Sequence, residues 1–177
     1  YLYYVTIKST KMKKLTLIIA FLTIAYGCNS NDYLMEFEKN TETAKAYFKL
    51  HEAENAETMF EYLHPDIEWH MPAYGAPMGG IDDVKAAIVG YQENFDELSF
   101  TANYWLPGVN TETGIPDGST RVYGTWTAIH NATGKKVELT IYTSFEFKDG
   151  KIFRGGDWFD LGGMMNSLMS DSNLDEG

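Results

Sequence analysis

The chain has 177 residues, of which 25 are acidic, 14 are basic and one is a cysteine, and its formal net charge is −11 at pH 7. This length fits one ordinary domain with a sizeable core. The excess of negative charge argues against nucleic acids and strongly anionic ligands as partners, because phosphate backbones are repelled. A single cysteine excludes an intrachain disulfide bond.

The first 27 residues have the pattern of a secretory signal. A basic stretch at 12–14 precedes an apolar run at 15–25, which is too short to cross a bilayer comfortably. Because small residues surround the site before Cys28, the segment resembles a bacterial lipoprotein signal, in which this cysteine becomes lipidated. Residues 1–11 lie upstream of a start at Met12. A free thiol near a terminus is the alternative interpretation of Cys28.

Cleavage before Cys28 would strengthen the acidic character of the chain. It would leave ten basic residues against 25 acidic ones, a formal charge of −15. Residues 28–40 are polar and acidic, and we expect them to form a tether between the lipid and the domain. The expected location is the bacterial cell envelope, with the protein anchored to the membrane by lipid and facing the periplasm or the cell surface.

The N-terminal part of the predicted domain shows helical periodicity. The spacing of apolar residues predicts a helix over 41–52 and a shorter one that Asn55 can cap. Alternation predicts a strand over 66–71, in which Trp69 and His70 face opposite ways. A Gly/Pro-rich loop at 72–80 leads into a helix from 82 to about 95, whose first turn is acidic.

From residue 98 onward the pattern has period two, which predicts strands at 99–106, 120–130, 137–147 and 152–159. Tight hairpin turns are expected at 133–134 and 149–150. Asp160 can cap a final short helix, and 170–177 is a polar tail. Residues 41–169 are thus predicted to form an α+β domain, a cone-shaped curved antiparallel sheet wrapped around N-terminal helices, with an apolar mouth suited to a ligand.

The last predicted strand carries a carboxylate among aromatic residues. Alternation places Phe153, Gly155, Asp157 and Phe159 on one face. If that face looks inward, burial raises the pKa of Asp157, which suits a general base or acid. The alternative is a structural carboxylate that is hydrogen-bonded to a Tyr or Trp.

Three stretches, residues 64–72, the glycines before Asp82 and residues 149–161, together resemble the nuclear transport factor 2-like superfamily. The likeness is strongest to its SnoaL-like branch and covers about residues 41–169. It implies a cone of helices and a curved sheet. Proteins of this fold include polyketide cyclases, steroid isomerases, dehydratases and epoxide hydrolases, so the resemblance alone does not define a reaction.

The resemblance also assigns roles to single positions. Asp157 falls where the cyclases and limonene epoxide hydrolase keep a catalytic aspartate, and His70 falls where the hydrolase has an asparagine that helps hold its water. The arginine and second aspartate of the hydrolase correspond to Gly124 and Trp126, and the histidine of the cyclases corresponds to Thr143. Epoxide hydrolysis by the known route is therefore not expected, and His70 is the candidate partner of Asp157.

The predicted site has Asp157 and His70 as catalytic residues, and its predicted pocket positions are Trp126, Thr143, Tyr74, Phe153 and Phe159. Aromatic residues of this kind can equally be core. The four histidines lack the close spacing of metal ligands, and residues 74–80 lack the lysine motif of a phosphate loop, so neither a metal nor another cofactor is expected.

Two functional hypotheses follow. In the first, the domain binds a small, largely apolar molecule and Asp157 supports proton transfer of the isomerase, cyclase or dehydratase type. In the second, it is a non-catalytic ligand-binding or protein-interaction domain at the cell envelope. The resemblance further implies a homodimer that forms through the open face of the sheet.

Overall fold

The structure is a computed structural model that describes residues 32–169. The predicted signal segment, the lipidation site at Cys28 and the polar tail at 170–177 lie outside the described residues. Within the described range, no helix is both long enough and apolar enough to cross a membrane.

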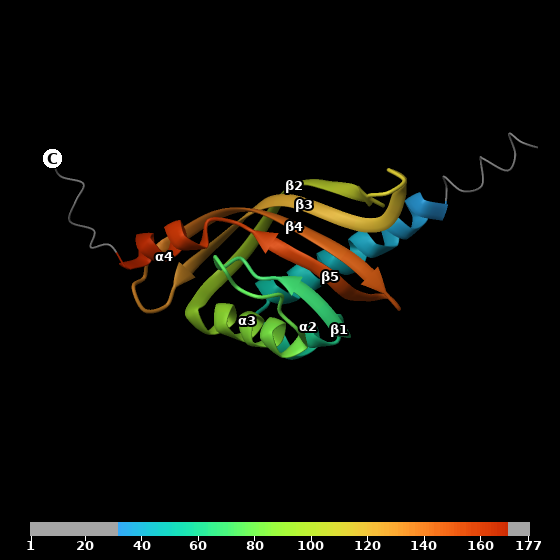
Figure 1. Cartoon of the computed structure of the whole chain (residues 1–177). Helices are drawn as coiled ribbons and strands as arrows, with labels where there is room; N and C mark the ends of the chain where they lie inside the picture. Colours follow the sequence, from blue (N-terminus) through green and yellow to red (C-terminus); the bar gives the residue numbers. More distant parts are fainter. Residues whose placement is uncertain (1–31, 170–177) are drawn as a thin grey trace, which may run out of the picture.

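The described chain forms a curved five-stranded sheet whose inner face is covered by helices (Figure 1). The first helix, residues 32–52, lies along the sheet, and α2 and α3 cover the same side. A last short helix, α4, lies at one end of the sheet. The remaining elements are α2 (Ala56–Phe60), β1 (Leu63–His70), α3 (Ile81–Asn94), β2 (Phe95–Val109), β3 (Pro116–His130), β4 (Lys136–Lys148), β5 (Lys151–Trp158) and α4 (Leu161–Met169).

This architecture confirms the predicted α+β class and the curved sheet against N-terminal helices. The strand order is β1-β5-β4-β3-β2. Neighbours from β5 to β2 are antiparallel, as expected, whereas β1 pairs in parallel with β5. The sheet is therefore mixed, because the chain leaves β1 through α3 and places β5 beside it only after three hairpins, β2–β3, β3–β4 and β4–β5.

The first helix is longer than predicted, because residues 32–40 of the expected tether are helical. Phe37 is half-buried and continues the helical spacing of the buried stripe. At the next turn, Asn40 Nδ2 donates to the carbonyl of Gly118 at 2.9 Å, and Thr41 Oγ1 donates to Thr120 Oγ1 at 3.1 Å. These contacts hold the helix against β3. The helical spacing was not recognised in the sequence because residues 32–40 contain many acidic side chains.

Two predicted helix caps and one predicted turn are confirmed. Asn55 accepts from the backbone N–H of Thr58 at the start of α2, and Asp160 accepts from that of Gly163 at the start of α4. Both residues of the 149–150 hairpin turn have positive φ, 53° and 75°. This turn sets the register in which β5 returns along β4.

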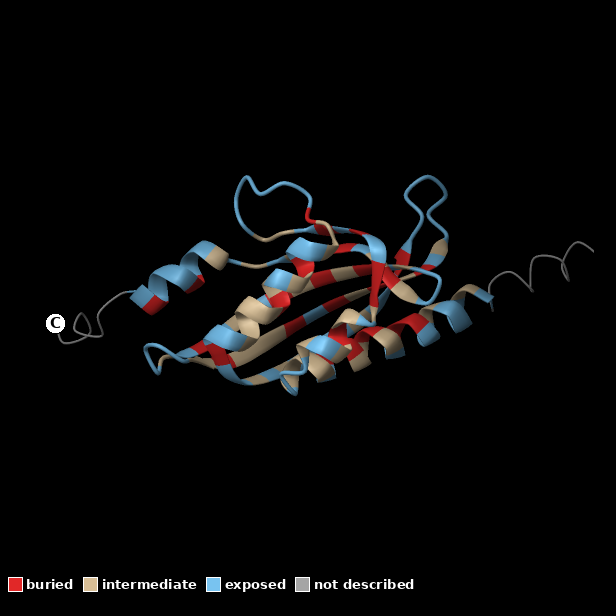
Figure 2. Cartoon of the chain, turned by 90° about the horizontal axis from the view of Figure 1, so that it is seen from below, coloured by how far each residue is buried: buried red, intermediate tan, exposed pale blue. Residues whose placement is uncertain are grey.

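The core fills the space between the inner face of the sheet and the helices. Buried residues follow one face of the first helix and alternate positions of the strands behind it (Figure 2). The largest fully buried side chains are Phe145, Met59, Ile152, Val122, Thr120 and Thr143. Two of these six are threonines, so polar groups enter the core at defined positions and need partners there.

Candidate active site in the apolar cavity

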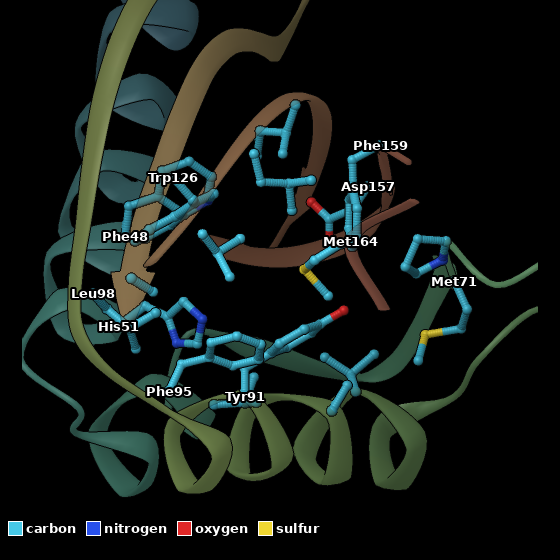
Figure 3. A pocket seen from close by; sticks show the side chains of 18 of the residues that line it. Phe48, His51, Met71, Tyr91, Phe95, Leu98, Trp126, Asp157, Phe159 and Met164 are labelled. Carbon is cyan, nitrogen blue, oxygen red and sulfur yellow. The ribbon is translucent and has the colours of Figure 1, made fainter. Parts of the chain in front are cut away.

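A cavity of about 130 Å³ lies between the inner face of the sheet, the first helix and α3 (Figure 3). Among the described residues that line it, Asp157 is the single carboxylate, and none is a lysine or arginine. Most of its wall is apolar, and it includes the rings of Tyr47, Phe48, Trp69, Tyr91, Trp126 and Phe159. Such a cavity favours ligands that are small, largely apolar and free of negative charge.

The Asp157 carboxylate is held by one donor from each neighbouring strand. Thr143 is its cross-strand partner on β4, and Thr143 Oγ1 donates to Asp157 Oδ1 at 2.7 Å. Trp69 projects inward from β1, and its Nε1 donates to Asp157 Oδ2 at 3.1 Å. Both oxygens therefore have fixed partners, and the carboxylate has a defined orientation at the cavity wall.

Burial raises the pKa of Asp157 above its usual range. The hydrogen bonds from Thr143 and Trp69 favour the anion and oppose this shift, but burial dominates. Burial, and secondarily the charge of Asp157, raises the pKa of Tyr91 to about 12 and raises the pKa of Tyr47 as well. Both phenols consequently stay protonated at neutral pH.

His51 is a cavity residue that was not among the predicted site residues, although helical spacing places it on one stripe with Tyr47 and Phe48. It lines the cavity from the first helix, with its ring edge-on to Trp126 at a centroid distance of 5.2 Å. Gln92 of α3 places its amide nitrogen 3.0 Å from His51 Nδ1. Burial lowers the pKa of His51 to about 4, so the imidazole is neutral at physiological pH.

His70, the predicted partner of Asp157, lies on the opposite face of the sheet. Its backbone pairs with Gly156, and its exposed ring packs against Trp158 at 5.7 Å. Alternation along β1 directs Trp69 inward and therefore directs His70 outward. The partner of Asp157 from this strand is Trp69, and His70 is not part of the cavity.

Phe153, a predicted pocket residue, also lies outside the cavity. The β4–β5 register shifts between Glu146 and Phe147, and Phe153 is the extra residue on β5. Such a bulge reverses the alternation on one side of it, so Phe153 does not share the face of Asp157. Its ring instead packs edge-on against His64 at 5.2 Å.

The other predicted pocket positions divide into two groups. Trp126 and Phe159 line the cavity, whereas Thr143 is fully buried and does not line it, although it donates to Asp157. Tyr74 is fully exposed in the loop before α3 and does not line the cavity. Within residues 32–169, no three side chains of the His, Cys, Asp or Glu type form a group that could hold a metal ion.

A curved sheet and helices around an apolar cavity with a half-buried carboxylate define a class of small α+β domains with an internal cavity. The sequence profile of the SnoaL-like domain matches residues 44–155. The chain belongs to this family, within the nuclear transport factor 2-like superfamily, as the motifs had suggested. A search among curated proteins found no match.

Solved structures show the same fold at low sequence identity. A candidate hydroxylase from Streptomyces galilaeus is 14% identical with a TM-score of 0.63, and the match covers 75% of this chain and 96% of that one. A candidate SnoaL-like polyketide cyclase from Jannaschia sp. CCS1 is 17% identical with a TM-score of 0.61, covering 76% and 94%. An epoxide hydrolase of the LEH type from M. tuberculosis is 17% identical with a TM-score of 0.55, covering 74% and 90%.

Proposed function

We propose that this domain binds a small, uncharged and largely apolar molecule in the cavity and moves a proton of that molecule through Asp157. The observation that carries the proposal is the position of Asp157. It is the single carboxylate among the described lining residues, and Thr143 and Trp69 hold both of its oxygens. A carboxylate that is oriented and has a raised pKa suits general acid–base work near neutral pH.

The chemistry that fits this site is proton transfer next to a carbonyl group. Asp157 accepts a proton from the carbon beside the carbonyl, and the electron pair of the broken C–H bond forms the enolate. Its protonated carboxyl can then return the proton to the same carbon or to another. Isomerisation, aldol-type cyclisation and dehydration all contain such a step, and the apolar wall limits competition from water.

The size of the cavity narrows the ligand class. Its volume of about 130 Å³ is close to the roughly 150 Å³ of an engineered cavity that binds benzene. A ligand with one six-membered ring and few substituents therefore fits. An anionic head group would find no lysine or arginine among the described residues that line the cavity.

A non-catalytic binding domain is the alternative. The observation that favours it is the position of His70, which leaves Asp157 without the proton-transfer partner that the sequence had suggested. An enzyme and a non-catalytic ligand-binding domain both require the cavity to bind a ligand, whereas a protein-interaction domain does not, and only the enzyme requires the proton of Asp157 to move.

Ligand binding can be measured through Trp69 and Trp126, which both line the cavity. Titration with cyclohexanone should change their fluorescence in a saturable way, and Asp157→Asn should retain most of this affinity. Tetramethylammonium is the contrasting probe, because rings around a carboxylate also suit a small cation. Saturable binding of tetramethylammonium that is lost in Asp157→Asn, together with no response to cyclohexanone, would contradict a neutral ligand.

The proposed location is the bacterial cell envelope, with Cys28 as the lipid anchor. The basic stretch, the apolar run and the small residues before Cys28 support this proposal. Mass spectrometry of the mature N-terminus should find acyl groups on Cys28, and Cys28→Ala should release the protein from membranes. An unmodified cysteine in membrane-free material would contradict the anchor.

The proposed assembly is a homodimer through the outer face of the sheet. A row of aromatic side chains crosses this face on neighbouring strands, with register partners Tyr104, Tyr123, Tyr142 and Trp158. Their rings contact one another at 4.8 Å and 5.1 Å along the last three positions. Tyr104 is 64% exposed and Trp158 is 43% exposed, which supports a partner surface rather than a solvated one.

A further inference from the structure

We propose that His51 is a ligand-binding residue whose Nε2–H donates to an acceptor oxygen of the bound molecule, with Gln92 holding the imidazole in the tautomer that makes this possible. The proposal rests on the proposed function, because it assigns a second polar contact to the same ligand in the same cavity. It also specifies the ligand class, namely a neutral single-ring molecule that carries a carbonyl oxygen.

The tautomer follows from the contacts of Gln92. Its amide nitrogen lies 3.0 Å from His51 Nδ1 and 3.2 Å from Met59 Sδ. An amide nitrogen only donates, and a thioether sulfur only accepts, so both of its hydrogens have acceptors here. The opposite orientation of the amide would place its oxygen against the sulfur, acceptor against acceptor. His51 Nδ1 is therefore the acceptor, and the proton of the neutral ring is on Nε2.

The surroundings keep this imidazole neutral and rigid. Its ring lies edge-on to Trp126 at 5.2 Å and to Tyr91 at 6.4 Å, so two aromatic side chains fix its plane. Burial lowers the pKa of His51 to about 4, and the ring consequently remains a neutral donor across the physiological range. The helices that carry His51 and Gln92 both contribute buried residues to the core, so the pair lies between two packed elements.

Figure 3 shows His51 and Asp157 on opposite sides of the cavity, both directed into it. A ligand between them meets a donor on one side and a proton acceptor on the other. When Asp157 removes a proton beside the carbonyl group, negative charge develops on the carbonyl oxygen. A fixed neutral donor aimed at that oxygen stabilises this charge without a reorganisation of solvent.

The test compares two ligands of the same shape, cyclohexanone and methylenecyclohexane, which differ in having C=O or C=CH₂. We expect the wild-type protein to bind the ketone about tenfold more tightly, the effect of one buried hydrogen bond. His51→Leu should bring the two affinities to within about twofold. Gln92→Leu should reduce the preference and, in ¹⁵N NMR spectra, convert His51 from the Nε2–H tautomer to a mixture.

The control variant is His130→Leu, because His130 lies outside the cavity and bonds to Thr133. It should leave the preference for the ketone unchanged. A preference for the ketone that survives His51→Leu, or a spectrum of folded wild-type protein with the proton on Nδ1, would overturn the assignment of His51. The spectrum requires no variant, so the assignment can be tested even if His51→Leu does not fold.

The same binding measurements distinguish a failure of the His51 assignment from a failure of the proposed function. If wild-type protein binds both molecules equally well, the role of His51 is wrong and the cavity remains a ligand site. If it binds neither molecule, the proposed function itself fails and the assignment of His51 fails with it.

Discussion

Trp69 donates its indole N–H to Asp157 at 3.1 Å and thereby links two strands of the sheet. The two residues lie 88 positions apart in the sequence. The two strands, β1 and β5, are the parallel pair of the sheet, and Trp69 pairs directly with Gly155. The absence of a side chain at Gly155 leaves room for the β4 backbone and for the indole, because a Cβ there would collide with the carbonyl oxygen of Ser144 and lie 2.6 Å from Trp69 Cζ3. The position of the carboxylate thus depends on a glycine two residues before it.

The first prediction concerns this glycine. Gly155→Ala should push β4 away at Ser144 and displace the indole of Trp69, and it should reduce the free energy of unfolding by about 1–3 kcal/mol, as overpacking of a core does. Urea denaturation measures the loss. Gly90→Ala is the matched control, since a Cβ there meets open space in α3, and helix propensity favours alanine by up to about 1 kcal/mol. Equal stability of the wild type and Gly155→Ala would show that the close approach is not required.

A second prediction concerns the donor on β4. Thr143→Val removes the hydroxyl that donates to Asp157 Oδ1, and because this bond lowers the pKa of the carboxyl, its loss should raise that pKa further. ¹³C NMR titration of the Asp157 carboxyl measures the change. Thr120→Val is the control, because Thr120 is also fully buried but bonds to Thr41. An equal shift of the Asp157 pKa in Thr143→Val and Thr120→Val would contradict a specific effect of the hydrogen bond from Thr143.

A third prediction concerns His51 and acid stability. The unfolded side chain takes up a proton at a pKa of 6.5, whereas the folded one does so only at about 4. Between these values the unfolded state binds more protons, so stability falls as the pH falls from 6.5 to 4, by up to about 3 kcal/mol.

His51→Leu lacks this proton uptake and should lose less stability than the wild type over the same interval. Thermal unfolding of both proteins at several pH values gives the difference, and the contribution of the carboxylates cancels between them. A stability gap that stays constant from pH 6.5 to pH 4 would mean that folded His51 titrates normally.

The fourth prediction concerns the outer face of the sheet. Tyr123 is 43% exposed in the middle of the aromatic row, so Tyr123→Glu should place a charge in the proposed dimer interface and dissociate it. Sedimentation velocity reports the mass in solution. Tyr74→Glu is the control, because Tyr74 is fully exposed in a loop away from this row. A monomeric wild-type protein would refute the proposed dimer.

Much of the fold could be predicted because its signals are local. Alternation gave the strands, the 149–150 turn gave the hairpin of β4 and β5, and Asn55 and Asp160 were recognisable as helix caps. The parallel pairing of β1 could not be predicted in this way, because it depends on where the chain returns after α3 and three hairpins.

The candidate site was predictable only in part. Asp157 followed from its strand, but the alternation that selected it also selected Phe153, since a bulge leaves no mark in a single sequence. His70 was chosen from the resemblance although alternation had already placed it opposite Trp69. His51 was not chosen as a site residue, although helical spacing places it on the same stripe as Tyr47 and Phe48. Its contact with Gln92, 41 residues away on another helix, could not be predicted.

If Asp157 moves a proton of a ligand in the cavity, the protein should exchange hydrogen for deuterium at the carbon beside the carbonyl group of cyclohexanone. This exchange can be followed in D₂O by ¹H NMR. The wild-type protein should accelerate this exchange above the buffer rate, and Asp157→Asn should abolish the acceleration while it still binds the ketone. Exchange that is equally fast with the wild type and with Asp157→Asn would contradict a catalytic role for this carboxylate.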